Sequence, residues 1–264
     1  MRAEALLAVK ELSLRRADGT PVLRDLSFQV APGEILGVVG QSGSGKSQLL
    51  LSLLGLSMRG AKLSGSAKFG AQELVNAPEA ALRRLRGTHI AMLFQDPLLS
   101  WNPCLRMEIQ LTEMLRARGL DAAAARARAC QGLADVELAE PQRILRQYPH
   151  ELSGGMRQRA MLAMATLPSP SLLLADEPTT ALDPTTQRRV LQRMRVLRQQ
   201  GMSIVLVTHD LGVVAALADR VLVLEEGVIV EQGDAAQLLR APRSEYARTL
   251  LNAARELEGL ACLP

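Results

Sequence analysis

Eight consecutive residues in the first fifth of the chain could hold the phosphates of a nucleotide. They fit the pattern G-x-x-x-x-G-K-[ST] and are Gly40, Gln41, Ser42, Gly43, Ser44, Gly45, Lys46 and Ser47. The glycines let the backbone curl so that successive N–H groups point at phosphate oxygens, and the following helix adds the positive end of its dipole. Lys46 would add a positive charge, and Ser47 a hydroxyl ligand for Mg²⁺. A plain glycine-rich turn is the alternative, and the complete pattern argues against it.

Two adjacent carboxylates follow a second apolar run. Leu172–Ala175 predicts a buried strand, and Asp176 and Glu177 come directly after it. Charges at the end of a buried strand have to be solvated or paired. Asp176 could support the Mg²⁺ shell, and Glu177, on the other side of the strand, could polarise an attacking water. Alone, such a pair before Pro178 is often only a turn; in a chain that also has a phosphate loop, the catalytic interpretation is favoured.

A second polar and glycine-rich helix start lies later in the chain, where Leu152–Arg159 reads LSGGMRQR. One nucleotide does not explain two such phosphate-binding stretches in one chain. The order of motifs supplies an answer, because it resembles the nucleotide-binding subunit of an ABC transporter. The motifs that carry this resemblance are Gly40–Ser47, Gln95, Leu152–Met156, Asp176-Glu177, Ala181-Leu182-Asp183 and His209.

The resemblance covers nearly the whole chain and implies a role for each motif residue. Glu177, His209 and Gln95 would be catalytic, with Gln95 reaching the metal or the water and His209 contacting the γ-phosphate. Taken alone, His209 would be an ordinary histidine at a strand end; its position after Ile204–Thr208 changes that interpretation. The cofactors would be ATP and Mg²⁺, and the expected metal ligands are Ser47, Gln95 and Asp176.

The glycine-rich stretch Leu152–Arg159 is expected to contact the nucleotide of a partner subunit rather than this chain's own nucleotide. In the family, Ser153, Gly154 and Gly155 match the signature that faces the γ-phosphate held by the other ATPase subunit, and Asp183 matches the D-loop aspartate. Hydrolysis would then depend on closure of two subunits. One departure from the family concerns adenine: the usual stacking aromatic is missing from Leu12–Arg16, where the guanidinium of Arg16 could stack on the base instead.

Longer stretches resemble one branch of the family, the importers of peptides, nickel and metal–opine complexes. They read FQDPLLSWNP, YPHELSGGMRQR, ADEPTTALDPTTQ and GVIVEQGDAAQLLRAP. Met156 and Thr179-Thr180 match the first ATPase of the unlike pair that such importers commonly use. The implied partners are a second homologous ATPase, two transmembrane permeases and, indirectly, an extracellular solute-binding protein. The end at Pro264, without clustered cysteines, favours the nickel or metal-chelate members over the peptide members.

Strand and helix patterns alternate along the chain, which predicts an α/β fold. The expected architecture is a P-loop, RecA-like core with a mostly parallel sheet, an N-terminal antiparallel β-subdomain and an inserted α-helical subdomain. The core would take about residues 1–97 and 160–235, the helical subdomain about 98–159, and a C-terminal helical segment about 236–264. In that last segment, Tyr246–Leu257 is apolar on one side and predicts a helix packed on the core, without a regulatory role.

Composition narrows the function classes. Of 264 residues, 48% are hydrophobic and only 2% aromatic, so an ample core must consist of aliphatic side chains. The net charge of +4 comes with no basic block interleaved with aromatics, so we expect no nucleic-acid partner. Neither a secretory leader nor an apolar run of about 18–20 residues is evident, which predicts a peripheral protein at the cytoplasmic face of the cell membrane. The alternatives are a soluble ABC-type ATPase acting on nucleic acid or ribosomes, and a P-loop kinase or plain NTPase.

Overall fold

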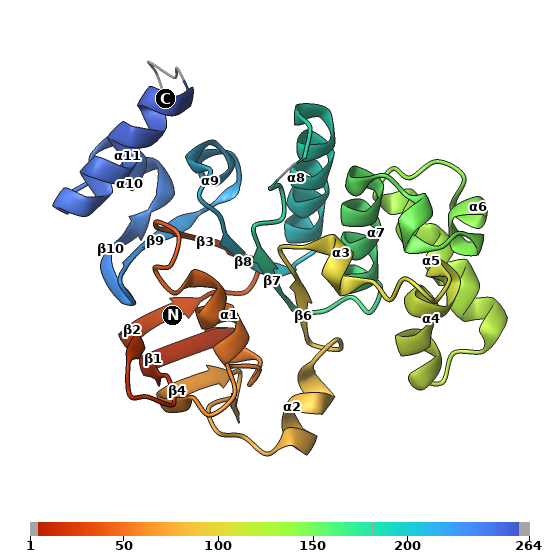
Figure 1. The fold of residues 1–264 in the computed structure, drawn as a ribbon, viewed down its shortest axis with the longest axis horizontal. Coiled ribbons are helices and arrows are strands. Elements are labelled where there is room, and N and C mark those ends of the chain that lie inside the picture. Colours follow the sequence, from red (N-terminus) through yellow and green to blue (C-terminus); the bar gives the residue numbers. More distant parts are fainter. Residues whose placement is uncertain (1–4, 181, 259–264) are drawn as a thin grey trace. The chain divides into compact units, whose positions relative to one another are not determined.

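The computed structural model of the chain describes residues 5–180 and 182–258. Its contacts divide the chain into two compact units, one formed by Met1–Arg86 with Ser203–Pro264 and the other by Gly87–Met202. Each unit is described by itself below, with the element labels of Figure 1. Ala181 of the predicted D-loop and Cys262 lie outside the described residues.

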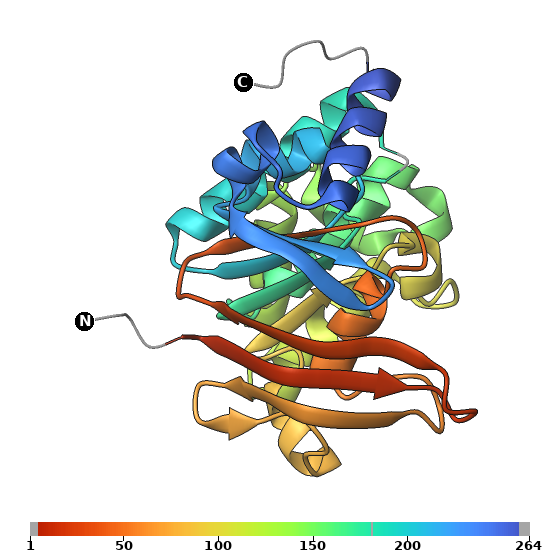
Figure 2. The same ribbon diagram turned by 90° about the vertical axis from the view of Figure 1, so that its left-hand side faces the viewer.

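The first unit contains the predicted antiparallel sheet. Its strands pair in the order β2-β1-β4-β5 and are β1 (Leu7–Arg15), β2 (Pro21–Val30), β4 (Lys62–Phe69) and β5 (Gln72–Glu73). Figure 2 shows β1 and β2 as long neighbouring ribbons joined by a tight turn. In that turn, Asp18 Oδ1 accepts a hydrogen bond from the Thr20 N–H at 2.9 Å. A short helix, α2 (Glu79–Leu85), follows the sheet.

The same unit holds a second group of strands, which carries the phosphate-loop motif. In spatial order they are β10 (Val228–Asp234), β9 (Arg220–Glu225), β3 (Ile35–Val39) and β8 (Ser203–Val207). β3 is parallel to both β8 and β9, whereas β10 is antiparallel to β9. Every residue of β3 and β8 is buried, as expected for central parallel strands covered on both faces. The prediction of a mostly parallel sheet is confirmed.

Helices follow the carboxyl ends of these parallel strands. α1 (Lys46–Leu53) comes after β3, and α9 (Leu211–Leu217) comes after β8. Two further helices, α10 (Ala235–Arg240) and α11 (Glu245–Glu258), complete the unit. Ala247 and Leu251 of α11 are buried in the same cluster as Val39 and Leu211. Within the described residues, α11 is therefore a helix packed on the core.

The second unit consists of a parallel strand pair and a group of helices. The strands are β6 (Ile90–Leu93) and β7 (Leu172–Asp176). The helices are α3 (Pro97–Ser100), α4 (Met107–Ala117), α5 (Ala122–Asp135), α6 (Pro141–Arg146), the 3-10 turn η1 (Pro149–Glu151), α7 (Gly154–Thr166) and α8 (Pro184–Gln199). The predicted helical insertion is thus present, and the residues between Ala117 and Ala122 separate α4 from α5. The boundaries 98–159 for a separate subdomain stay a prediction.

Among the described residues, no helix combines the length and the apolar character that crossing a bilayer requires.

Candidate active site

The loop from Gly40 to Ser47 connects β3 to α1 and is held by its surroundings in the first unit. A Cβ atom on Gly40 would lie 2.1 Å from the Leu224 carbonyl oxygen, so no other residue fits where the loop leaves β3. Gly45 has a left-handed φ of 103° at the start of α1. The turn between β9 and β10 supports the loop from the side, because the Gly227 N–H donates to the Ser44 carbonyl at 3.0 Å. The loop conformation is therefore fixed by its neighbours.

Lys46 reaches back over this loop. Its Nζ donates to the carbonyl oxygens of Gly40 and Gln41, at 2.8 Å each, and the residue is 6% exposed. Ser47 stands beside it in the first turn of α1 and is half-buried. A backbone loop that only glycine allows, a buried ammonium group and a helix start together fit nucleotide phosphates. The Ser47 hydroxyl is a suitable oxygen ligand for Mg²⁺.

The support from the β9–β10 turn predicts a destabilising substitution. Gly227 has a φ of +79°, and a Cβ there would lie 2.2 Å from the Val22 carbonyl oxygen. We expect Gly227→Ala to lower the free energy of unfolding by more than the roughly 1–2 kcal/mol that a left-handed conformation alone costs, because backbone atoms must also move. Gly233→Ala is the matched control in β10, since a Cβ there meets nothing within 4 Å. Urea unfolding that ranks both variants equally would contradict this account.

His209 lies in the first unit, just beyond the carboxyl end of β8, and is exposed. The N–H of Thr208 donates to the Val38 carbonyl at 3.3 Å, which ties the end of β8 to β3. Asp210 caps α9 by accepting from the Val213 N–H at 2.9 Å. Because β3 and β8 run parallel, the phosphate loop and His209 emerge from the same edge of the strand group.

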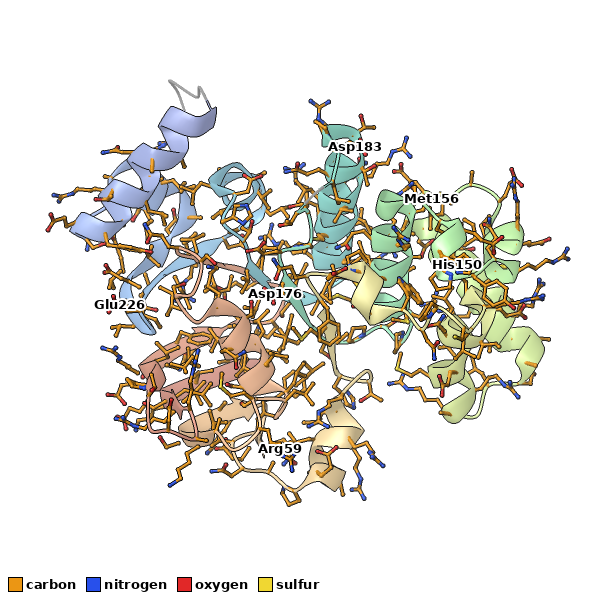
Figure 3. All side chains as sticks on the ribbon, in the orientation of Figure 1. Arg59, His150, Met156, Asp176, Asp183 and Glu226 are labelled. Atoms are coloured by element: carbon orange, nitrogen blue, oxygen red, sulfur yellow. The ribbon has the colours of Figure 1, made fainter. Side chains whose placement is uncertain are left out.

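The predicted acidic strand end lies in the second unit. Asp176 is the last residue of β7 and is 5% exposed, and Figure 3 marks it at the strand end. Glu177 opens the following turn with a φ of 46°, which is unusual for a residue with a side chain. Its Oε2 accepts hydrogen bonds from Gln95 Nε2 at 3.1 Å and from Thr180 Oγ1 at 2.9 Å. Two of the predicted catalytic residues, Gln95 and Glu177, are therefore in direct contact.

Two side chains that support this turn are absent from the set predicted from the sequence. Thr180 donates a hydrogen bond to the Glu177 carboxylate. In the sequence it is used only to assign the chain to one branch of the family. Gln158 is 3% exposed within α7, and its Nε2 donates to the Pro178 carbonyl at 2.7 Å. A signal existed for each in the sequence: a hydroxyl three residues after a candidate base, and an amide in the helix that follows the signature.

Ser153, Gly154 and Gly155 form the start of α7. Ser153 is exposed and caps the helix, because its Oγ accepts from the Met156 N–H at 3.3 Å. Gly155 lies close to α8, where a Cβ on it would be 3.0 Å from Cγ2 of Thr186. The predicted signature is thus a capped helix start whose first turn faces the first turn of α8.

Asp183 caps α8 in the same manner. Its Oδ1 accepts from the N–H groups of Thr185 and Thr186, at 3.0 Å each. Hydrogen bonds from the side chain and backbone of Thr186 hold the pKa of Asp183 below its ordinary value. Figure 3 shows Met156 and Asp183 at the starts of α7 and α8. The predicted signature and the predicted D-loop aspartate therefore lie on two helix starts that approach each other closely.

Comparison with known proteins gives consistent matches. The family model described as ABC transporter matches residues 23–180. The oligopeptide transport ATP-binding protein OppD of Salmonella typhimurium is 43% identical over 261 residues, covering 97% of this chain and 78% of that protein. The dipeptide transport ATP-binding protein DppD of Escherichia coli is 42% identical, with 98% and 83% covered. The peptidoglycan transport ATP-binding protein YejF of Agrobacterium fabrum is 45% identical over 95% of this chain and 47% of its own length.

Solved structures agree with these matches. The ATP-binding cassette MJ0796, as a dimer in a post-hydrolysis state bound to ADP and Pi, has a TM-score of 0.77 and 27% identity. The alignment covers 87% of this chain and 98% of that chain. The expected ABC ATPase fold is confirmed, and these relatives give no support to a P-loop kinase or to an ATPase acting on nucleic acid or ribosomes. The chain belongs to the ABC transporter family, as one of its ATP-binding, ATP-hydrolysing subunits.

Proposed function

We propose that this chain drives an importer of peptides by hydrolysing ATP bound at Gly40–Ser47. One observation carries the proposal: 42–45% identity along nearly the whole chain to ATP-binding proteins named for oligopeptide, dipeptide and peptidoglycan transport. None of these relatives is named for a metal. Nickel and metal–opine complexes are therefore the second candidate solutes.

In this proposal, the residues of the phosphate loop bind and neutralise the nucleotide. The N–H groups of Gly43–Ser47 and the ammonium group of Lys46 meet the phosphate oxygens. The resemblance to the family implies that Ser47, Gln95 and Asp176 would supply oxygen ligands for Mg²⁺, which when bound would offset the charge of the phosphates. Asp176 suits this role, because carboxylate oxygens are among the ligands that Mg²⁺ prefers in proteins.

Glu177 is proposed as the base that polarises the attacking water. Gln95 and Thr180 donate to one of its carboxylate oxygens, Oε2, which restrains the orientation of the carboxylate. In-line attack on the γ-phosphorus forms a bond from the water oxygen while the bond to the β–γ bridging oxygen breaks, giving ADP and phosphate. His209 would contact the γ-phosphate during this step. Positioning and charge neutralisation account for most of the rate in such reactions.

The proposed assembly contains a second, homologous ATPase, two permeases and, indirectly, an extracellular solute-binding protein. Closure of the two ATPases would move the segment after Gln95 against the permeases at the cytoplasmic face of the membrane. The relative named as the ATP-binding cassette MJ0796 supports pairing, since it was solved as a dimer. Within this chain, the proposed helical subdomain takes about residues 98–159.

The test combines capture with uptake. Affinity purification of the tagged chain from detergent-solubilised membranes of its host should recover two permeases and a second ATPase by mass spectrometry. Deleting the gene should then reduce uptake of labelled di- and oligopeptides and leave ⁶³Ni uptake unchanged. Loss of nickel uptake alone would transfer the solute assignment to the second candidate, and recovery of ribosomal proteins in place of permeases would refute the transporter assignment.

Because the start of α7 is exposed, we expect a substitution there to lower ATP turnover without changing ATP binding. Ser153→Arg places a long cation where the signature is proposed to face the nucleotide of the other ATPase. We expect the variant to bind ATP with wild-type affinity, yet to lose at least about tenfold in the turnover of the assembled transporter, since closure is blocked. The control is Gln72→Arg, because Gln72 is exposed. Ser244→Arg would not serve, because Ser244 caps α11. Equal turnover in the two variants would contradict the signature assignment.

A further inference from the structure

The C-terminal helix contacts the phosphate loop directly. The backbone N–H of Gln41 donates a hydrogen bond to the hydroxyl oxygen of Tyr246 at 2.9 Å, between residues 205 positions apart. Tyr246 lies in the first turn of α11, and both residues belong to the first unit. The family motifs do not include this tyrosine, and the sequence analysis assigns it only to an apolar helix face.

The two residues just before α11 are hydrogen-bonded to β10. The carboxylate of Glu231 accepts from the Arg243 N–H at 3.0 and 3.1 Å and from the Ser244 N–H at 2.8 Å. Burial acts to raise the pKa of Glu231, but these hydrogen bonds outweigh it and leave the pKa below its ordinary value. The carboxylate is therefore charged at neutral pH, and it holds the residues just before Tyr246 in place.

The ring of Tyr246 is held as well. It is half-buried against the cluster that includes Val39 at the end of β3, Leu211 at the start of α9, and Ala247 and Leu251 of its own helix. Figure 1 shows α11 alongside α10 and β10. An aromatic ring has few rotatable bonds, so a packed ring on an anchored helix places its hydroxyl with little freedom.

The peptide group that Tyr246 contacts is also the one that Lys46 contacts. The Gly40–Gln41 peptide donates its N–H to Tyr246 Oη, and its carbonyl oxygen accepts from Lys46 Nζ at 2.8 Å. A hydrogen bond at one end of a peptide group polarises it and strengthens the bond at the other end. The hydroxyl of Tyr246 thus fixes the orientation of the loop at the point where the lysine is held.

We propose that Tyr246 is a positioning residue for nucleotide binding, and that α11 holds the phosphate loop in its binding conformation through this one hydroxyl. The inference rests on the proposed binding of ATP at Gly40–Ser47. Tyr246 acts through Gln41 and Lys46 and not on the reacting atoms. Its loss therefore weakens ATP binding and leaves the turnover of bound ATP unchanged.

Tyr246→Phe in the full chain tests the proposal, because the ring stays in the cluster while the hydroxyl is removed. We expect ATP to bind about threefold to tenfold more weakly, the range that one neutral hydrogen bond supplies. Titration with a fluorescent ATP analogue gives the affinity, and steady-state kinetics should show a raised KM with an unchanged kcat. Thr249→Val is the matched control, since it removes an exposed hydroxyl one turn along the same helix.

A second measurement does not depend on activity. In the nucleotide-free chain, hydrogen exchange of the Gln41 amide should be faster in Tyr246→Phe than in the wild type or Thr249→Val, at equal thermal stability. Wild-type affinity and wild-type exchange in Tyr246→Phe would overturn the positioning role, as would a lowered kcat at constant KM. Lys46→Ala identifies a different failure: if it binds ATP normally, the proposed nucleotide site itself is wrong, and the inference falls with it.

Discussion

Glu177→Gln should abolish ATP turnover while leaving ATP binding intact. The amide keeps the size of the side chain, and its oxygen can still accept from Gln95 Nε2 or Thr180 Oγ1, as Glu177 Oε2 does at 3.1 and 2.9 Å. It cannot take up a proton from the attacking water. General-base catalysis typically contributes a factor of about 10²–10⁴, so turnover should fall by at least that range.

Single-turnover hydrolysis and equilibrium ATP binding, measured on the same preparation, check this expectation. Glu113→Gln is the control, because it makes the same chemical change on the exposed surface of α4. With ATP retained and hydrolysis blocked, Glu177→Gln should also accumulate the closed pair of ATPases. Turnover at the wild-type rate would show that another group acts as the base.

Lys46→Ala should have the opposite effect and lose the nucleotide itself. The ammonium group is 6% exposed and is the charged donor to two loop carbonyls, at 2.8 Å each. Hydrogen bonds that involve a charged group contribute about 1.5–3 kcal/mol each, so losing the bonds that the ammonium group is proposed to make to the phosphate oxygens should weaken ATP binding about a hundredfold or more.

Isothermal titration with ATP and Mg²⁺ measures the loss. Lys62→Ala, an exposed lysine of β4 in the same unit, controls for the change in net charge. If Lys46→Ala bound ATP as well as the control does, the phosphates would have to be held elsewhere. Together with Glu177→Gln, this variant separates the residues that bind from the residue that drives attack.

The phosphate loop could be predicted from the sequence because its chemistry is contiguous. Eight adjacent residues carry the whole pattern, and the apolar run before them is β3 as observed. The contact between Gln95 and Glu177 could not be predicted from spacing, since 82 positions separate them. It arises because β6 and β7 pair in parallel, so that the residues after each strand leave from the same edge. Only the resemblance to a family placed these two residues together in advance.

Elements without a strong pattern are missing from the sequence-based prediction. β4 reads KLSGSAKF, in which small and polar residues obscure any alternation, and its pairing with β1 is a tertiary effect. α10 lies within the predicted helical segment 236–264, but its six residues carry no pattern that separates it from α11, and it begins at the cap that Asp234 gives to the Gln237 N–H at 3.0 Å. Tyr246 illustrates the same limit for function, because the apolar pattern predicts its ring position and gives no information on the partner of its hydroxyl.

The position of β3 between β8 and β9 has a consequence for biosynthesis. This strand is entirely apolar, and both of its hydrogen-bonding neighbours come from the last quarter of the chain, beginning at Ser203. At about 5–20 residues per second, a ribosome needs roughly 10–30 s to bridge that interval. Throughout this time the nascent chain carries an apolar strand with two unpaired edges, which is a template for aggregation. The segment that ends in the ATP-binding loop is thus exposed to aggregation during translation until the last quarter of the chain is made.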